Sequence, residues 1–290
     1  MTQKIIESIE TLLASHQPEG LAKIQSKMEG SEQIDQKLFF YLFAICSRWF
    51  DAKTVDVNAS SYWQKKDAFG ILPTWQWPSL ARLYILLLVA ERNTKEDYIH
   101  LYKTLFNSAD VQESIVLIQS LAFVPQSEAF VEKAREAARS NITTMFIAVA
   151  HNSNYAFNYF DESGWNQLVL KAAFLNVAIV KIYGLKSRNN TQLVKMLCDY
   201  ASERQVASRS VPWDLWCCVA WAANSEENYQ YLKTQFARGD IKTKAAIALA
   251  LMENQNEHAA TLGQQLSQND ELRQMPNPLT WEIISTYNAT

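Results

Sequence analysis

The chain has 290 residues, of which 48% are hydrophobic and 20% charged, and its formal net charge is -3 at pH 7. This small negative charge excludes a bulk electrostatic attraction to nucleic acid or to an anionic membrane. Seven glycines and seven prolines are too few for a protein built from sheets and tight turns, so the composition predicts long helices joined by short connections.

The first 17 residues alternate charged and apolar side chains at helical spacing, without the apolar core and small-residue cleavage site of a signal peptide. The longest wholly apolar run, residues 83–90, is far shorter than the roughly 18 residues that a membrane-spanning helix needs. The cysteines form no CxxC pair and no disulfide framework, which is typical of a reducing compartment. We therefore expect a cytoplasmic protein without a transmembrane segment.

Apolar residues recur at the i, i+3, i+4 and i+7 positions along nearly the whole chain, and no run of strands is evident. This periodicity predicts helices over residues 2–16, 19–29, 32–50, 78–92, 95–107, 110–123, 127–150 (as one helix or two), 161–182, 189–207, 212–223, 226–237, 241–253 and 256–268.

Two residue pairs at predicted helix starts have the spacing of capping boxes, Thr94 with Asp97 and Asp110 with Glu113. Two prolines suit a first helical turn, Pro78 and Pro212. Successive helices of similar length predict a single all-α domain over residues 1–290, made of antiparallel helix pairs stacked as an α-α superhelix of the HEAT or armadillo kind. Because no clear sequence repeat is found, an irregular helical bundle is the alternative.

Residues 51–77 interrupt the helical pattern and are rich in aromatic residues. A connection this long is usually functional or disordered, and its aromatic content argues against disorder. One interpretation is an ordered loop that covers the apolar edge of the first helices. The other is a lid or a loop that binds a partner.

Common catalytic signatures are missing from the sequence. There is no GxGxxG, GxxxxGK[ST], HExxH, GxSxG or DDxxD motif, and no Glu-x-x-His pair of a di-iron bundle. We therefore expect no cofactor and no metal site, and we assign no catalytic residue. The aromatic stripe in "VPWDLWCCVAW", residues 211–221, indicates either core packing or the wall of a ligand site.

The segment "HNSNYAFNYFDESGWNQLVLKAAF", residues 151–174, places many hydrogen-bonding side chains among apolar neighbours. A helical projection of residues 161–175 predicts a helix buried nearly all round, with Gln167 and Lys171 as its narrow polar stripe. A buried lysine needs a carboxylate, carbonyl groups, an anion or an exit to solvent. In the next predicted helix Arg204 lies in the middle of the apolar face, whereas Glu203 lies on the solvated side.

These observations define a candidate polar cluster of His151, Asn154, Tyr155, Tyr159, Asp161, Trp165, Asn166, Lys171, Arg188, Glu203, Arg204 and Arg209. Two interpretations remain open. Either Asp161 and nearby carbonyl groups neutralise the cations in a structural network, or the cluster surrounds an anionic or carbonyl-rich ligand.

Residues 151–216 resemble the EboA family of bacterial proteins. The resemblance is carried by Tyr159-Phe160-Asp161, Trp165-Asn166-Gln167, Leu170-Lys171-Ala172, Gly184-Leu185 with Arg188, Asp199-Tyr200 and Glu203-Arg204. In that family an aromatic residue commonly follows the first arginine and a small or glycine residue often precedes the second, whereas this chain has Gln205 and Ser208 there.

The resemblance implies a cytoplasmic helical protein encoded beside enzymes. These are a UbiA-type membrane prenyltransferase, a TatD-type hydrolase, a sugar-isomerase-like barrel and a dehydroquinate-synthase-like protein. Such clusters are associated with making or moving a secondary metabolite or its precursor. The resemblance assigns no reaction to the EboA protein itself.

The leading hypothesis is a non-catalytic adaptor or scaffold that contacts the proteins encoded beside it and serves a secondary-metabolite pathway. The alternative is a binding protein or enzyme for a small aromatic, prenylated or anionic metabolite, with Lys171 as the amine nucleophile or base and Asp161 as its partner. A pocket lined by Lys171, Arg204 and tyrosines would favour this alternative.

Overall fold

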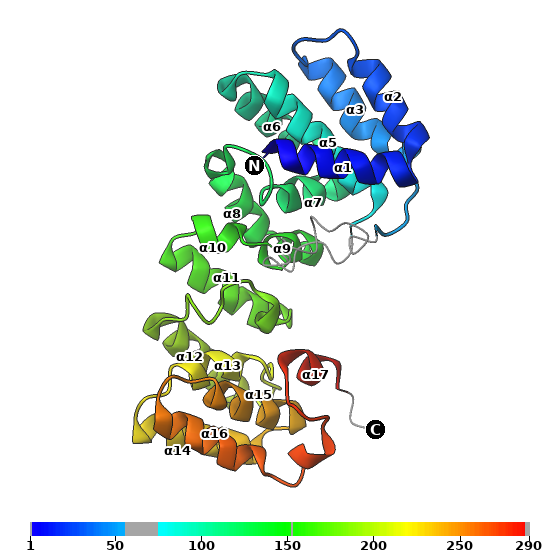
Figure 1. Ribbon diagram of the computed structural model, residues 1–290. Helices are drawn as coiled ribbons and strands as arrows, with labels where there is room; N and C mark the ends of the chain where they lie inside the picture. Colours follow the sequence, from blue (N-terminus) through cyan, green and yellow to red (C-terminus); the bar gives the residue numbers. More distant parts are fainter. Residues whose placement is uncertain (1, 56–74, 152, 288–290) are drawn as a thin grey trace. The chain divides into compact units, whose positions relative to one another are not determined.

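The computed structural model describes residues 2–55, 75–151 and 153–287, and its regular structure is helical (Figure 1). These residues form 16 α-helices and three short 3₁₀-helices, with no strand beyond an isolated bridge between Thr54 and Gln76. The all-α class expected from the sequence is confirmed, while the superhelical stacking stays a prediction. The chain divides into two compact units, Met1–Phe160 and Asp161–Thr290.

The N-terminal unit contains the helices α1 (Thr2–His16), α2 (Pro18–Met28), α3 (Gln36–Trp49), α5 (Trp77–Arg92), α6 (Lys95–Ser108), α7 (Val111–Ser120), η3 (Ser127–Phe130), α8 (Val131–Arg139), α9 (Thr143–Ala150) and α10 (Tyr155–Tyr159). The C-terminal unit contains α11 (Glu162–Leu175), η4 (Ile179–Lys181), α12 (Thr191–Val206), α13 (Leu215–Trp221), α14 (Glu226–Arg238), α15 (Ile241–Met252), α16 (Glu257–Ser267), η5 (Leu272–Gln274) and α17 (Trp281–Thr286).

The local start signals read from the sequence are largely confirmed. Asp110 and Glu113 form a full capping box at the start of α7, and the Thr94 side chain accepts the Asp97 amide at the start of α6. A proline occupies the first turn of α5, as expected for Pro78. Pro212 does not begin a helix, because α13 starts three residues later, at Leu215.

The predicted helix over 161–182 is too long, because α11 ends at Leu175. Asn176 adopts a left-handed conformation with φ of 54°, and its amide donates to the carbonyls of Ala172 and Ala173. Asparagine tolerates this conformation better than most residues and commonly ends helices in this way. The short helices α10 and α17 were not predicted, because a turn or two carries too little periodicity to detect.

Most of the aromatic loop predicted at 51–77 lies outside the described residues, so the prediction of a lid or docking loop stays open. Its described end contributes to the core. The Trp75 ring is 3% exposed and meets Phe123 edge-on at 5.9 Å, and Trp77 stacks on His16 at 5.1 Å. These contacts agree with the interpretation of a loop whose aromatic side chains cover apolar helix surfaces.

Helix α5 forms the centre of the N-terminal unit and packs against α1, α3 and α7. It carries one buried cation, Arg82, which is 7% exposed. The Arg82 guanidinium donates to the Phe43 carbonyl at 3.0 Å and forms an ion pair with Glu113 at 3.4 Å. A buried charge is tolerated only when it is paired and hydrogen-bonded, so Arg82 fixes the positions of α3 and α7 against α5.

Helix α15 has the same central role in the C-terminal unit, packing against α13, α14, α16 and α17. A side chain on Gly263 of α16 would come within 2.8 Å of the Ala248 carbonyl, so glycine permits the close approach of α16 to α15. Lys244, which is 9% exposed, is neutralised by Glu271, with 2.5 Å between the ammonium and the carboxylate. Each central helix thus holds one buried cation beside a carboxylate.

A buried carboxylate holds the connection between α11 and α12. Asp214 is 3% exposed, and its Oδ2 atom accepts the amides of Ile179 at 2.6 Å and Val180 at 3.3 Å. Burial raises the pKa of Asp214 from 3.8 to about 6, and the two backbone hydrogen bonds oppose this rise. The start of η4 therefore depends on a carboxylate that titrates above its usual range.

We expect Asp214→Asn to remove a pH-dependent component of stability. A carboxyl whose pKa is higher in the folded state stabilises the fold fully below about pH 4 and loses this contribution as the pH rises through 6. For two pKa units the loss is roughly 3 kcal/mol. Urea unfolding of both proteins from pH 4 to 7 measures it: the stability of the native protein should fall relative to that of the variant. Parallel pH profiles would contradict the assignment.

Candidate functional site

The residues expected to form one polar cluster fall in both compact units. His151, Asn154, Tyr155 and Tyr159 belong to the N-terminal unit, and the series from Asp161 to Arg209 belongs to the C-terminal unit.

In the N-terminal unit the cluster residues stabilise the ends of short helices. The Tyr155 hydroxyl is buried and donates to the Ser127 carbonyl at 2.5 Å, and burial raises its pKa. The Tyr159 ring packs on Tyr155 with ring centres 4.7 Å apart. His151 follows the last turn of α9, and the Asn154 carbonyl accepts the first intrahelical amide of α10.

In the C-terminal unit two asparagines form a reciprocal amide pair. Asn166 is 3% exposed; its Nδ2 donates to Asn190 Oδ1 at 3.2 Å, and its Oδ1 accepts from Asn190 Nδ2 at 2.9 Å. Asn190 also caps α12 by accepting the Leu193 amide at 2.9 Å. A side chain of α11 is thus tied to the first turn of α12, which satisfies buried donors and acceptors at once.

Arg188 covers the indole of Trp165, with 4.6 Å between the guanidinium carbon and the ring centre. Trp165 is fully buried, so the arginine closes an aromatic surface of α11. Burial lowers the pKa of Arg188, and the charges of Asp161 and Glu162 oppose that shift. Arg188 therefore interacts electrostatically with Asp161.

Helix geometry argues against the pairing of Lys171 with Asp161 that the sequence suggested. Asp161 caps α11, accepting the Gly164 amide at 2.8 Å, and it is exposed. Ten residues of helix separate the two side chains by about 15 Å along the axis. Lys171 is half-buried, and burial lowers its pKa. The prediction of all-round burial also fails, since Phe174 is 62% exposed. Asp161 therefore cannot orient Lys171 as a nucleophile or base.

Arg204 determines how α12 ends. Its Nε donates to the Ser210 carbonyl at 2.8 Å, and its own carbonyl accepts the Arg209 amide at 2.8 Å. Ser208 has a φ of 53°, a conformation that glycine adopts without strain. This explains physically why a small residue or glycine suits the position before the second arginine. Glu203 and Arg209 are exposed, as the helical projection indicated for Glu203.

Sequence reasoning missed several residues that complete the polar network of the C-terminal unit. Asp214 holds η4, Asn189 donates to the Cys218 carbonyl at 2.8 Å, and the Tyr200 hydroxyl donates to the Ala173 carbonyl at 3.2 Å. Asn190, next to the predicted helix start at 189, had a detectable signal because asparagine is a preferred N-cap. The partners of the others lie 27 to 35 residues away, which no local pattern reveals.

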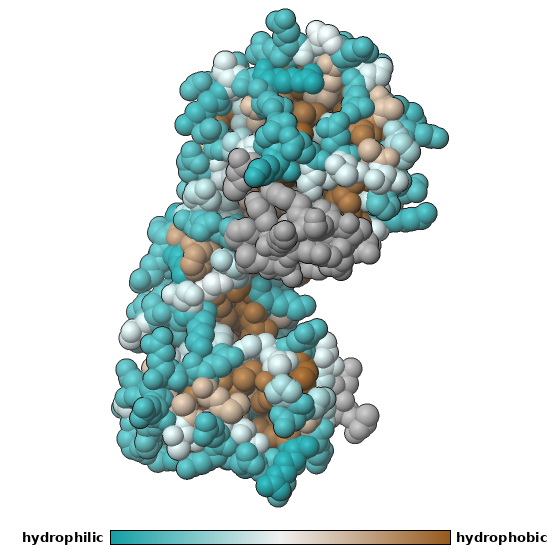
Figure 2. All heavy atoms as spheres, viewed as in Figure 1, coloured by the Kyte–Doolittle hydropathy of each residue, from teal (hydrophilic) through white to brown (hydrophobic). Residues whose placement is uncertain are grey.

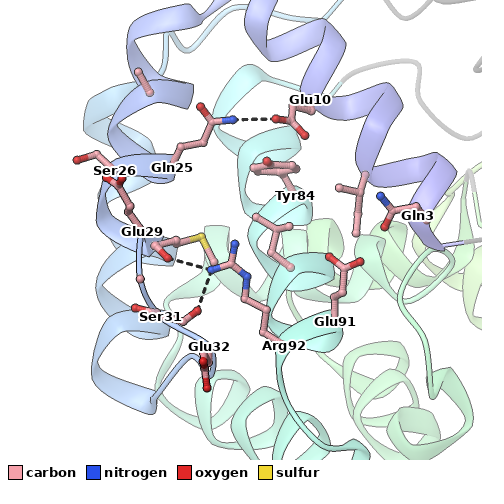
Figure 3. A pocket seen from close by; sticks show the side chains of 15 residues that line it. Gln3, Glu10, Gln25, Ser26, Glu29, Ser31, Glu32, Tyr84, Glu91 and Arg92 are labelled. Atoms are coloured by element: carbon pink, nitrogen blue, oxygen red, sulfur yellow. Dashed lines mark hydrogen bonds between the residues drawn. The ribbon is translucent and has the colours of Figure 1, made fainter.

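A groove of about 870 Å³ in the N-terminal unit is lined by α1, α2, α5 and the turn at 29–32 (Figure 3). Its apolar wall contains the buried side chains of Ile6, Met28, Tyr84 and Leu88. Its polar lining includes four carboxylates, Glu10, Glu29, Glu32 and Glu91. Outside the groove, polar side chains cover most of the visible face of this unit, and apolar ones show mainly between the helices (Figure 2).

The side chains that line this acidic groove carry a net negative charge. Its one lining cation, Arg92, donates to the carbonyls of Met28 at 3.0 Å and Ser31 at 3.2 Å, which fixes the guanidinium in the wall. Gln25 donates to Glu10 at 2.7 Å. Burial and the charge of Glu10 raise the pKa of Tyr84 to about 12, so this phenol stays neutral. The groove is suited to a ligand with positive charges beside an apolar group.

A second pocket, of about 440 Å³, lies in the C-terminal unit and includes one residue of the predicted cluster, Arg209. Its other lining residues are Gln205, Ser210, Val211, Trp216, Gln235, Arg238, Gly239, Asp240 and Thr243. Trp216, from the aromatic stripe of residues 211–221, is 2% exposed and so belongs to the core; it also borders this pocket, and the alternative of a ligand wall stays a prediction.

Two further properties bear on function. Within the described ranges, no group of three or more His, Cys, Asp or Glu side chains is placed to hold a metal ion. No helix in those ranges combines the length and apolarity needed to cross a membrane.

The reciprocal amide pair predicts strong coupling between Asn166 and Asn190. We expect Asn166→Ala to destabilise the fold by about 1–3 kcal/mol, because it removes both hydrogen bonds of the pair, each of which contributes about 0.5–1.5 kcal/mol. Asn190→Ala should cost more, since it also removes the cap of α12. In a double-mutant cycle followed by thermal unfolding, the coupling energy should be about 0.5–3 kcal/mol. Strict additivity would show that the pair does not form.

In contrast to the asparagine pair, Asp161 and Lys171 are expected to show no coupling energy. Asp161→Ala should cost about 1 kcal/mol through the lost cap of α11. Because Lys171 lies about 15 Å away, Lys171→Met should not rescue this loss. We expect the effects of the two substitutions on unfolding free energy to add within about 0.5 kcal/mol. Recovery of stability in the double variant would instead indicate that the two side chains form the ion pair predicted from the sequence.

Comparison with known proteins agrees with the resemblance found in residues 151–216 and extends it. A family model described as metabolite traffic protein EboA matches residues 2–220, which include the acidic groove and most of the polar network. No curated protein and no solved structure gives a significant match. Since the match covers most of the chain, from the first helix through α13, the protein belongs to the EboA family.

Proposed function

We propose that this protein is a non-catalytic accessory protein of metabolite traffic, which acts in the cytoplasm as an adaptor for proteins of the same secondary-metabolite pathway. The acidic groove of the N-terminal unit is its docking site for a basic segment of a partner. The observation that carries the proposal is the excess of carboxylates around an apolar wall, while the nearby arginine is already bound to carbonyls.

The chemistry of the groove defines the partner segment. Four glutamates attract lysine and arginine side chains, and the surface of Tyr84, Leu88 and Met28 accepts an apolar side chain between them. Cytoplasmic loops of membrane proteins are enriched in lysine and arginine. The partner that fits best is a cytoplasmic loop of a membrane protein, such as the prenyltransferase that the family resemblance implies.

The contacts in residues 151–216 favour this function over the enzymatic alternative. Tyr155, Asp161, Asn166 and Asn190 are engaged with backbone or side-chain partners inside their own units. Asp161 lies too far from Lys171 to be its catalytic partner. The polar cluster thus has the properties of a structural network, and the adaptor role is assigned to the groove.

The direct test measures binding of peptides from the cytoplasmic loops of the neighbouring prenyltransferase by fluorescence anisotropy. A loop rich in lysine and arginine should bind, and its affinity should fall with added salt because exposed ion pairs are screened. The variant Glu29→Lys/Glu32→Lys/Glu91→Lys changes three exposed groove residues. Its affinity should be lower by tenfold or more, since several exposed pairs contribute about 0.2–1 kcal/mol each.

The matched control is Glu203→Lys/Glu227→Lys/Asp270→Lys, which makes the same change in net charge at exposed positions of the C-terminal unit. It should bind like the native protein, and both variants should keep the native far-ultraviolet circular dichroism. In the host, pathway output should fall with the groove variant alone. The proposal is rejected if no loop peptide binds, or if the groove and control variants lose affinity equally.

A further inference from the structure

The 440 Å³ pocket of the C-terminal unit is built by four segments. These are the end of α12, the loop 207–214 with the first turn of α13, the last turn of α14 and the first turn of α15. Gly239 makes the sharp α14–α15 connection possible, because a side chain there would collide with the Thr243 side chain. The pocket is therefore formed by rigid helix ends, and its volume falls in the range usual for small-molecule sites.

Two arginines give the pocket its charge. Arg209 comes from the loop after α12 and Arg238 from the last turn of α14, and both side chains are exposed. Within the described part of the chain neither guanidinium has an ion-pair or hydrogen-bond partner. The one lining carboxylate, Asp240, already caps α15 by accepting the Thr243 amide at 2.8 Å. Two positive groups are thus available to a ligand, whereas the one lining carboxylate is already bound to a backbone amide.

The remaining lining is ordered and partly apolar. Val211 supplies a half-buried aliphatic surface, and Trp216 borders the pocket with 2% of its surface exposed. Gln235, which is 5% exposed, accepts from Gln205 at 2.7 Å, so these amides are held in place before any ligand arrives. Arg204 holds the Ser210 carbonyl and so fixes the loop that carries Arg209. A preorganised wall of this kind lowers the entropic cost of binding.

We propose that this pocket binds a small organic anion, with its phosphate or carboxylate group between Arg209 and Arg238 and a flat apolar body against Trp216. Guanidinium groups bind both anions through paired hydrogen bonds, and an aromatic wall favours a planar body. Arg204 acts as a positioning residue for this site. The proposal does not rest on the acidic groove, because every residue of the pocket lies in the other unit.

Isothermal titration calorimetry with phenyl phosphate, benzoate, inorganic phosphate and benzyl alcohol tests the proposal. Saturable binding of phenyl phosphate or benzoate is expected, and the tighter of the two identifies the preferred anion. Inorganic phosphate should bind at least tenfold more weakly than phenyl phosphate because it lacks the apolar body. Benzyl alcohol should not bind measurably, because it lacks the charge.

The variant Arg209→Gln/Arg238→Gln should weaken binding by about tenfold for each arginine, since hydrogen bonds to charged groups are the stronger kind. Its thermal midpoint should stay close to that of the native protein because both side chains are exposed. Arg273→Gln, an exposed arginine outside the pocket lining, is the control and should bind normally. The proposal is overturned if neither organic anion binds, if inorganic phosphate binds as tightly as phenyl phosphate, or if the double variant binds like the control.

Discussion

The ends of buried helices leave backbone amides and carbonyls without intrahelical partners, and several polar side chains in residues 151–216 meet this requirement. Asp161 and Asn190 cap the two helices α11 and α12. Asp214 accepts two amides at η4, while Asn189 and Tyr200 donate to carbonyls of α13 and α11. Short helices have a larger fraction of their residues at ends, so a chain divided into many of them needs many such side chains. Part of the asparagine and tyrosine content of this segment follows from this need.

The sequence predicted features that depend on neighbours within one or two helical turns. The helical class and the capping box of Asp110 and Glu113 are of this kind. Features set by distant residues were not predictable. A helical projection gives the direction of Lys171 around its axis, but it cannot say which element covers that face or that Phe174 is exposed. The groove joins residues 3–32 to residues 84–92, and the pocket joins residues 205–216 to residues 235–243, so neither leaves a local pattern.

The requirement that a buried cation has a partner holds in this protein, but the lysine that it constrains most is Lys244 and not Lys171. Lys244 lies in the first turn of α15, just before its apolar stretch, is 9% exposed and pairs with Glu271. Arg82 is buried in the same way in α5 and pairs with Glu113. Both cations lie on the central helix of their unit, where the neighbouring elements cover most of the side chain. Lys171 lies on a helix with an exposed face, so the same physical requirement constrains it less.

The residues matched by the family model include all of one candidate binding region and only part of the other. Residues 2–220 contain every residue that lines the acidic groove. They contain only the Arg209 side of the pocket, because Gln235, Arg238 and Thr243 lie on helices beyond the match. If metabolite traffic depends on docking to a partner, the docking surface has to lie in the part of the chain that defines the family. The proposed anion pocket is completed by α14 and α15, which lie beyond the match, so the family match bears on the docking proposal and leaves the anion proposal to its own test.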